Sequence, residues 1–385
     1  MSGMHYEAGK NINRHRASMN GERAAELQEQ AWRLQAEGRF ADALGAAREA
    51  LRIIEEADGP DSPDVANLLN DLAEIEMDRQ NVAAALELAE RARVIVDALG
   101  DNFSGEDATR IFARTQGLLG AIRRSESKYC CAEDHLKKAL ARVAAEFGEA
   151  SEEAAETRNN LGVLYKDWGR FEEGLQLYKE ALHAMIGRHG EECLDTAAIY
   201  HNIGGILHSQ GRFAAAEQPG RKAWDISQRV AGEDHPSTML DAAAYAAILD
   251  GLGRYDESER VYRRALAVFE RHFGSEHYEV AVTLHNLAAV LANRGQDEEA
   301  EAHYRRALAI KETTLGGESL DAALTRHNLG SLLNRIGRSK EALPLLQSAV
   351  SILEQRLMPE HPHLAIAREN LRKAVLADGF AGAVF

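Results

Sequence analysis

The apolar residues of this chain recur with the period of an α-helix, most clearly in "TLHNLAAVLANRG" at residues 283–295. The apolar positions of that stretch fall at i, i+3, i+4 and i+7: Leu284, Leu287, Ala288 and Leu291. This spacing places them on one face of a helix that packs against a core. Gly295 follows and is expected to end the helix, because glycine adopts the left-handed C′ conformation without steric cost.

A second helix is predicted after that glycine, over residues 297–314, with Ala300, Tyr304 and Ala307 on one face. The alanines allow the two helices to approach closely, and the tyrosine fills the space beside them. The segment "LGGESLD" (315–321) supplies turn residues and a capping serine, and prolines 236 and 362 stand where other helices are expected to begin. The unit is therefore a helix-turn-helix hairpin.

The helix-ending glycines show that this hairpin is repeated. They are spaced by 42 residues: Gly169, Gly211, Gly253, Gly295 and Gly337. Counting back by the same step reaches a degenerate copy at Ser127, and Gly38 and Gln80 form an earlier, weaker pair. The distance from Gln80 to Ser127 is 47 residues, so five residues are inserted, which we place in the loop around "LGDNFSGEDAT" (99–109). Eight units are predicted.

These units predict an all-α solenoid of about eight helix-turn-helix repeats with a C-terminal capping helix. One hairpin cannot fold alone, because about six large side chains at ~2 kcal/mol each do not offset ~1.5 kcal/mol of ordering cost per residue. The expected boundaries are a disordered leader at 1–21, repeats near 22–63, 64–106, 107–150, 151–193, 194–235, 236–277, 278–319 and 320–361, a cap at 362–378 and an apolar tail at 379–385.

Composition and charge limit the cellular location and the partners expected of this solenoid. Hydrophobic residues make up 45% and charged residues 28%, and no apolar run approaches the ~20 residues that cross a bilayer. A net charge of −16 repels nucleic acid and anionic lipid. Cys130, Cys131 and Cys193 have neither metal-site nor disulfide spacing. We therefore expect a cytoplasmic protein with no metal, no cofactor, no nucleic-acid partner and no membrane partner.

The string "AVTLHNLAAVLANRGQDEEAEAHYRRALAIKETTLG" (281–316) resembles the 42-residue tetratricopeptide repeats of kinesin light chains and similar bacterial proteins. The similarity runs from residue 22 over nearly all of the chain. No long heptad region precedes the repeats, so a light chain's motor-binding role is not expected. The resemblance implies a right-handed superhelix whose first helices line a concave groove. It also implies one asparagine per first helix pointing into that groove: Asn160, Asn202, Asn286 and Asn328.

A helical wheel of the first helix points to the same face, independently of the resemblance to the family. Asn286 shares a face with Val282, Ala289 and Asn293, and Arg335 lies on the equivalent face of the eighth unit. An amide beside small residues suits an extended peptide held by its main chain. Helices pack ~8–10 Å apart and an extended chain rises ~3.3 Å per residue, so one asparagine per repeat meets about every third ligand residue. The alternative is that the asparagines bridge adjacent repeats and stiffen the solenoid.

Three histidines directly precede asparagines of this row: His201, His285 and His327. A step of ~10 Å between repeats is too long for shared metal ligation at ~2.1 Å, so a metal site is not expected. Packing and hydrogen bonding between first helices is the simpler interpretation, and tuning of peptide binding between about pH 6 and 7 is the alternative. The histidines join the asparagines, Asn293 and Arg335 as candidate peptide-binding residues.

The expected function is that of a protein–protein interaction scaffold or adaptor that binds a peptide or partner segment in the concave groove. No phosphate-binding loop, nucleophile elbow or HExxH motif is present, so we do not expect an enzyme. The acidic balance favours a neutral or basic partner. The alternatives are a self-assembling solenoid that forms a homodimer, and a small-molecule sensor or enzyme.

Two departures interrupt the pattern. Ala244 stands where the neighbouring units have asparagine, and Pro219-Gly220 falls inside a predicted second helix. Proline there costs about 3 kcal/mol or kinks the helix, and Trp224 is expected to refill the lost aromatic volume. A bend or hinge near residues 215–250 is one interpretation, and local wear in a tolerant repeat is the other.

Overall fold

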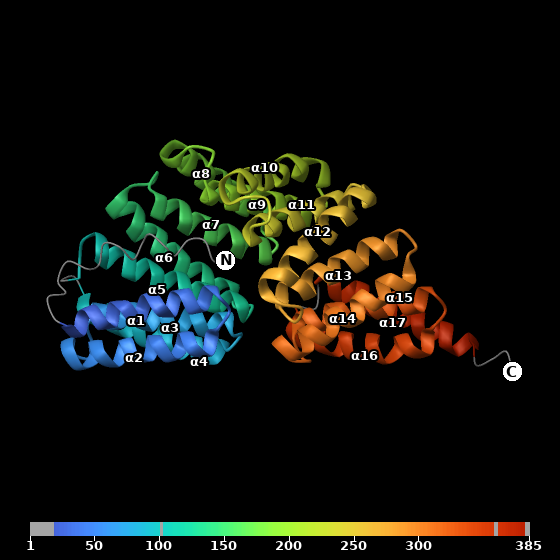
Figure 1. Cartoon of the computed structure of the whole chain (residues 1–385), viewed down its shortest axis with the longest axis horizontal. Helices are drawn as coiled ribbons and strands as arrows, with labels where there is room; N and C mark the ends of the chain where they lie inside the picture. The colour runs from blue at the N-terminus through green and yellow to red at the C-terminus, as the bar shows by residue number, and fades with distance from the viewer. Residues whose placement is uncertain (1–18, 101–102, 358–360, 382–385) are drawn as a thin grey trace. The chain divides into compact units, whose positions relative to one another are not determined.

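The computed structural model describes residues 19–100, 103–357 and 361–381, and these residues form seventeen α-helices and no strand. The helices alternate as first and second members of eight hairpins, followed by a capping helix (Figure 1). The first helices are α1 (Met19–Ala36), α3 (Pro63–Asp78), α5 (Glu106–Ser125), α7 (Glu152–Asp167), α9 (Leu194–Ser209), α11 (Pro236–Gly251), α13 (Tyr278–Asn293) and α15 (Leu320–Arg335). The second helices are α2 (Phe40–Asp58), α4 (Val82–Leu99), α6 (Tyr129–Phe147), α8 (Phe171–His189), α10 (Phe213–Ala231), α12 (Tyr255–Phe273), α14 (Asp297–Leu315) and α16 (Ser339–Arg356), and the cap is α17 (Pro362–Ala381).

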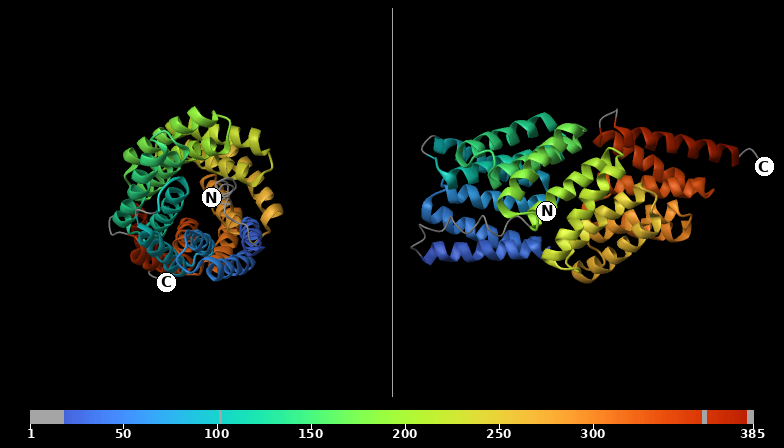
Figure 2. Two further views of the ribbon diagram at one scale, coloured as in Figure 1. Left: turned by 90° about the vertical axis from the view of Figure 1, so that its left-hand side faces the viewer. Right: turned by 90° about the horizontal axis from the view of Figure 1, so that it is seen from above.

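The helices belong to two compact units, α1–α9 up to Ser209 and α10–α17 from Gln210. Within each unit every helix packs against the next one along the chain (Figure 2). First helices of adjacent hairpins also touch, as α3 touches α5 and α13 touches α15. The expected all-α repeat solenoid is confirmed.

The helix-ending positions adopt the left-handed backbone that their spacing predicts. Gly169, Gly253 and Gly337 have φ of 81°, 75° and 83°. Among the described residues, the non-glycine residues with positive φ are the two degenerate copies, Gln80 at 61° and Ser127 at 59°. The fold therefore imposes the turn even where the sequence lacks glycine, at a steric cost of about 1–2 kcal/mol.

We expect Ser127→Gly to raise the free energy of unfolding of the N-terminal unit by about 1 kcal/mol, because it removes the Cβ that disfavours positive φ. Urea unfolding followed by circular dichroism measures this change. Ser127→Ala is the matched control, since it keeps the Cβ and removes only the hydroxyl group. An alanine variant as stable as the glycine variant contradicts the interpretation.

The core of each hairpin is built as the apolar period predicts. Leu284, Leu287, Ala288 and Leu291 are all fully buried, as are Ala300 and Ala307 of the next helix. Tyr304 is 3% exposed and lies in one core cluster with Leu287, Ala288, Leu291 and Ala300. In the fourth hairpin the approach is closer, because a Cβ at Gly162 would lie 2.4 Å from the Tyr178 ring. A small residue at this point lets the tyrosine of the second helix lie against the first.

Several first helices begin with a cap, as expected. The Ser319 hydroxyl accepts a hydrogen bond from the Ala322 amide at 3.3 Å, and Pro236 occupies the first turn of α11. Histidine takes the serine's place in two hairpins: the Nδ1 atoms of His235 and His277 accept from backbone amides two residues later, both at 3.2 Å. An acceptor Nδ1 requires a neutral imidazole.

Several boundaries differ from the expected ones. α1 begins at Met19, before the expected start at 22, and α17 extends to Ala381, beyond 378. The insertion before Ser127 mostly lengthens a helix: α5 has 20 residues, whereas α3 and α7 have 16. Residues 1–18 of the leader and 382–385 of the tail lie outside the described residues.

Pro219 does not break its helix. α10 continues through it from Phe213 to Ala231, and Pro219 is buried. Gly220 stands where other hairpins have tyrosine, and a Cβ there would lie 2.5 Å from the Ile248 Cδ1 atom. The Trp224 ring packs against Tyr245 at 5.8 Å between centroids. A proline and a large aromatic residue thus replace the usual tyrosine contact, and the hinge remains a prediction.

Candidate peptide-binding face

The predicted asparagines lie in one column of the first helices. Asn160 on α7 is exposed, whereas Asn202 on α9, Asn286 on α13 and Asn328 on α15 are partly buried. Each is followed two positions later by the small residue or glycine against which the second helix packs. We call these equivalent positions the column and, in each compact unit separately, the surface around them the first-helix face.

Some asparagines of the column bridge adjacent first helices. The Nδ2 atom of Asn202 donates to Asn159 Oδ1 at 2.8 Å, and that of Asn328 donates to His285 Nε2 at 3.1 Å. The cap continues the series, because Asn370 Nδ2 lies 3.0 Å from His327 Nε2. Every bridge joins residues 43 positions apart, so it connects a column residue to the residue just before its counterpart in the preceding hairpin.

Asn328 is engaged on both sides of its amide. Its Oδ1 atom accepts from His327 Nδ1 at 3.1 Å, while its Nδ2 atom donates to His285. One N–H and one oxygen lone pair of this amide are therefore already committed within the protein. For Asn202 and Asn328 the bridging alternative therefore describes the observed contacts, and a role in ligand binding is a separate proposal.

Two asparagines of the column have no such bridge. Their counterparts 43 residues earlier are Gly117 for Asn160 and Ala243 for Asn286, and neither has a side-chain acceptor. Within the described residues, neither Asn160 nor Asn286 makes a side-chain hydrogen bond in the structure. Each unit therefore presents one asparagine with a free donor and a free acceptor.

His285 is held neutral between three helices. Its Nδ1 atom lies 3.0 Å from the Thr325 hydroxyl, whose own proton goes to the Asp321 carbonyl oxygen at 2.9 Å. Nδ1 is therefore the donor, and Nε2 accepts from Asn328. Burial, with the nearby positive charge of Lys311 and the neighbouring His327, lowers the pKa of His285 to about 3.

His327 has the same arrangement one hairpin later, with Nδ1 donating to Asn328 and Nε2 accepting from Asn370. Burial lowers its pKa as well. His201 on α9 is partly buried. The structure thus assigns His285 and His327 to bridges between first helices, as the simpler interpretation of the sequence had it.

The two remaining candidates lie at the C-terminal ends of first helices and are exposed. Asn293 donates to Asp250 Oδ1 at 3.2 Å, and Arg335 forms an ion pair with Asp297. Both partners belong to neighbouring helices. Contacts of this kind are solvated and contribute at most about 1 kcal/mol, so either side chain can exchange its partner for a ligand.

The N-terminal unit has a buried charged network that the sequence did not reveal. Asp71 on α3 has a side chain with 0% exposure and accepts from Gln28 Nε2 at 2.5 Å and Trp32 Nε1 at 3.1 Å. Arg114 on α5 donates to Asp71 at 2.6 Å and to Glu74 at 2.9 Å. These carboxylates raise the pKa of Arg114, which stays charged. Asp71 takes the column position of the asparagines, so the bridge is ionic here.

A second recurrent contact was also missed. An arginine directly after the helix-ending glycine binds the glutamate three residues later and a glutamate 37 residues earlier on the preceding second helix. The arginines are Arg170, Arg254 and Arg338. The recurring "GR" followed by Glu three positions later could have revealed it. The arginines of these ion pairs are solvated, so each pair adds little to the free energy of unfolding.

Glu156 lies one helical turn before the free asparagine Asn160. Burial raises its pKa to about 7, and the like charges of Glu152, Asp195 and Glu153 add to this. No described cation pairs with it. A basic group of a ligand at this point would lower that pKa.

Other kinds of site find no support in the described part of the chain. No group of three or more His, Cys, Asp or Glu side chains there is arranged to hold a metal ion. None of the described helices has the length and apolar content needed to cross a membrane.

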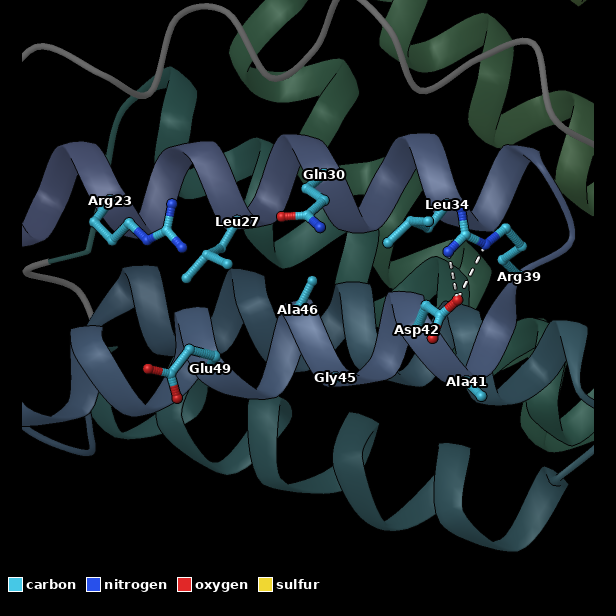
Figure 3. Close-up of a pocket in the computed structure, with 10 residues that line it drawn as sticks. All are labelled: Arg23, Leu27, Gln30, Leu34, Arg39, Ala41, Asp42, Gly45, Ala46 and Glu49. Atoms are coloured by element: carbon cyan, nitrogen blue, oxygen red, sulfur yellow. Dashed lines mark hydrogen bonds and ion pairs between the residues drawn. The ribbon is translucent and has the colours of Figure 1, made fainter.

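A hollow between α1 and α2 has Leu27, Leu34 and Ala46 at its floor (Figure 3). Charged groups surround it, and Arg39 binds Asp42 there at 2.7 Å. The hollow corresponds to a surface that later hairpins bury: Arg23 and Gln30 stand where α13 has the fully buried Val280 and Leu287. Polar residues at these positions are what a terminal repeat requires, so we interpret the hollow as an end face of the solenoid.

Stacked helix hairpins with a 42-residue period define an α-solenoid of the repeat-protein class. A tetratricopeptide-repeat family model matches residues 34–97, 112–187, 168–229, 195–271, 238–313 and 279–355, which together span more than half of the chain. The chain therefore belongs to the tetratricopeptide-repeat family. This confirms the resemblance, and it supports in general terms a protein-interaction scaffold, since the family is generally non-enzymatic.

Several solved structures are similar to this chain. The crystal structure of BtubC (BKLC) from P. vanneervenii is 25% identical, with a TM-score of 0.49 over 62% of this chain and 92% of that one. A putative kinesin light chain of Podosopora anserina with nearly identical TPR-like repeats is 20% identical, with a TM-score of 0.44 over 54% and 99%. A Rap protein complexed with Competence and Sporulation Factor is 15% identical, with a TM-score of 0.54 over 94% and 99%. No match was found among curated proteins.

Proposed function

We propose that this tetratricopeptide-repeat protein binds an extended peptide segment of a partner protein on its first-helix face. Each compact unit has its own site, in which Asn160 or Asn286 holds the main chain of the bound segment. The observation that carries the proposal is the pair of asparagines left without a bridging partner. A side-chain amide with a free donor and a free acceptor matches the donor and acceptor of one peptide group.

The bridged residues have a different part in this proposal. Asn202, Asn328 and His285 link adjacent first helices and keep the face rigid. A rigid face lowers the entropic cost of binding, because fewer side chains need to be ordered when the ligand arrives. Near Asn160, the uncompensated carboxyl group of Glu156 favours a ligand with a basic side chain at that point.

Substitution of the two free asparagines separates binding from stability. We expect Asn160→Ala and Asn286→Ala together to weaken capture of peptides from a random phage-displayed library by about 10-fold or more. At either site, the variant loses the two hydrogen bonds, at ~1 kcal/mol each, between the amide and one peptide group. The melting temperature should stay within about 1 °C of the wild type, since neither amide supports the fold.

The matched control is the pair Asn202→Ala and Asn328→Ala, which removes two asparagines of the same column. We expect this variant to melt at a lower temperature, because Asn159 and His285 lose their donors, each loss costing about 1 kcal/mol. If the variant without Asn160 and Asn286 captures the same peptides as well as the wild type does, the proposed site is ruled out. Scanning calorimetry measures the melting temperature, and the display assay measures peptide capture, on the same protein preparations.

A further inference from the structure

The C-terminal unit carries a row of aliphatic side chains beside its asparagine column. The row has one member on each of four first-type helices, α11, α13, α15 and α17, at steps of 42 residues. Its members are Leu240, Val282, Leu324 and Ile366. Each lies four residues before a column position, which is one helical turn, so the row and the column run side by side.

The side chains of the aliphatic row are only partly buried in the core. Leu240 and Leu324 pack against core clusters but remain partly accessible, and Val282 is partly accessible as well. Ile366 is 52% exposed, although Leu364 and Ala367 beside it on α17 are buried. Folding of the cap therefore does not explain why residue 366 is a large aliphatic residue.

The repeat itself does not require this row. The corresponding positions in the N-terminal unit are Arg114, Glu156 and Ala198. A hairpin of the same fold thus accepts a cation, an anion or a methyl group at the same point. The aliphatic row is a property of the C-terminal unit alone, and this points to a ligand with apolar side chains.

The spacing of the row limits the conformation of such a ligand. First helices of successive hairpins recur at intervals of about 8–10 Å. In a β-strand, side chains on one face recur every second residue, at ~6.6 Å, or every fourth, at ~13 Å, and neither matches the step. In a polyproline II helix every third side chain returns to the same face, at about 9.3 Å, which matches it.

The main chain of a polyproline II helix also suits the free asparagine. Its peptide groups make no internal hydrogen bonds and are available to a partner. Asn286 can therefore bind one peptide group of the ligand while the adjacent aliphatic side chains lie against Val282 and Leu324. The ligand thus makes the same contact with each hairpin of the unit, because one of its aliphatic side chains lies against the row at each step.

We propose that the first-helix face of the C-terminal unit binds a polyproline II segment with an aliphatic side chain at every third residue. This inference rests on the proposed function and names the class of peptide that the face selects. It makes the row Leu240, Val282, Leu324 and Ile366 the specificity-determining residues, and Asn286 the residue that holds the main chain.

The test compares peptides of equal composition. Fluorescein-labelled 12-residue peptides carry four leucines in an alanine and proline background, placed at every third residue, at every second residue, or in one block. Fluorescence anisotropy with the full-length protein should give a dissociation constant at least 10-fold lower for the period-three peptide. Equal or tighter binding of the period-two peptide overturns the inference.

Variants locate the binding on the row. Leu324→Ser and Ile366→Ser should each weaken binding of the period-three peptide about 5-fold or more, and Ile366→Ser cannot disturb the core because its side chain is exposed. Val230→Ser is the matched control, since Val230 is a 46% exposed aliphatic residue of the same unit that lies on a second helix. Unchanged binding by the Ile366 variant overturns the inference.

Unbiased selection separates this inference from the proposed function. Random displayed peptides whose capture depends on Asn286 and which share period-three aliphatic residues support both. Asn286-dependent peptides without that period overturn the inference and leave the proposed function standing. Selected peptides that are indifferent to both Asn160 and Asn286 overturn both.

Discussion

Replacement of Arg114 by methionine should lower the free energy of unfolding of the N-terminal unit by about 3–5 kcal/mol, one of the two largest effects we expect. The guanidinium group donates to Asp71 at 2.6 Å, to Glu74 at 2.9 Å and to Asn67 at 2.8 Å. Asp71 has no solvent exposure, so the variant leaves a buried carboxylate without its cation. Urea unfolding monitored by circular dichroism and by Trp32 fluorescence measures the loss.

An exposed ion-pair cluster is the control. Arg52 binds Glu49 at 2.7 Å and Glu56 at 2.6 Å, but its side chain is 54% exposed. Arg52→Met should leave the free energy of unfolding nearly unchanged, because water solvates the freed carboxylates. Addition of Asp71→Asn to the Arg114 variant should recover part of the loss. If the Arg114 and Arg52 variants lose equal stability, the buried network does not support the unit.

The second large effect concerns pH. The pKa of His285 falls from the ordinary value of about 6.5 to about 3 in the folded protein. Between these values the unfolded chain binds a proton that the folded chain excludes. The contribution of His285 is therefore complete above about pH 6.5 and is lost as the pH falls towards about 3, by a few kcal/mol in all.

A substitution at residue 285 separates the contribution of His285 to the free energy of unfolding from the general loss of stability in acid. His285→Gln offers a non-titrating acceptor to Asn328, so its stability should fall less between pH 7 and pH 4.5 than that of the wild type. His183→Gln, at an exposed position on α8, should follow the wild type. Urea midpoints at the two pH values give the comparison, and parallel losses for all three proteins would contradict the assignment.

Bridging and ligand binding use the same kind of side chain in this molecule, and the difference lies in the preceding hairpin. Asn328 donates a hydrogen bond to His285 of the preceding hairpin. The corresponding residue for Asn286 is Ala243, which has no side-chain acceptor, so the Asn286 amide remains free. The sixth hairpin, whose column position is Ala244, also has alanine at position 243, where a bridge to Asn286 would need an acceptor. Removal of an acceptor from one helix leaves an amide unpaired on the next.

The sequence alone predicted most of the fold. The apolar period of 283–295, its glycine and the 42-residue step determine hairpins that cannot bury their faces singly, so stacking follows. The left-handed backbone at Ser127 shows how firmly the repeat is specified, since it persists there without glycine. The helical period also placed Asn160 and Asn286 on one face. These are local properties, because residues three or four apart on a helix are neighbours whatever surrounds them.

Only the tertiary structure decided which of those asparagines are free. A bridge joins residues 43 positions apart, and its existence depends on the register in which two first helices pack. The helical wheel of one hairpin contains no information about that register. The Asp71–Arg114 network and the neutral state of His285 have the same origin, because burial and partner distance arise between helices. The sequence therefore defined the face, and the packing of neighbouring hairpins decided what that face can still bind.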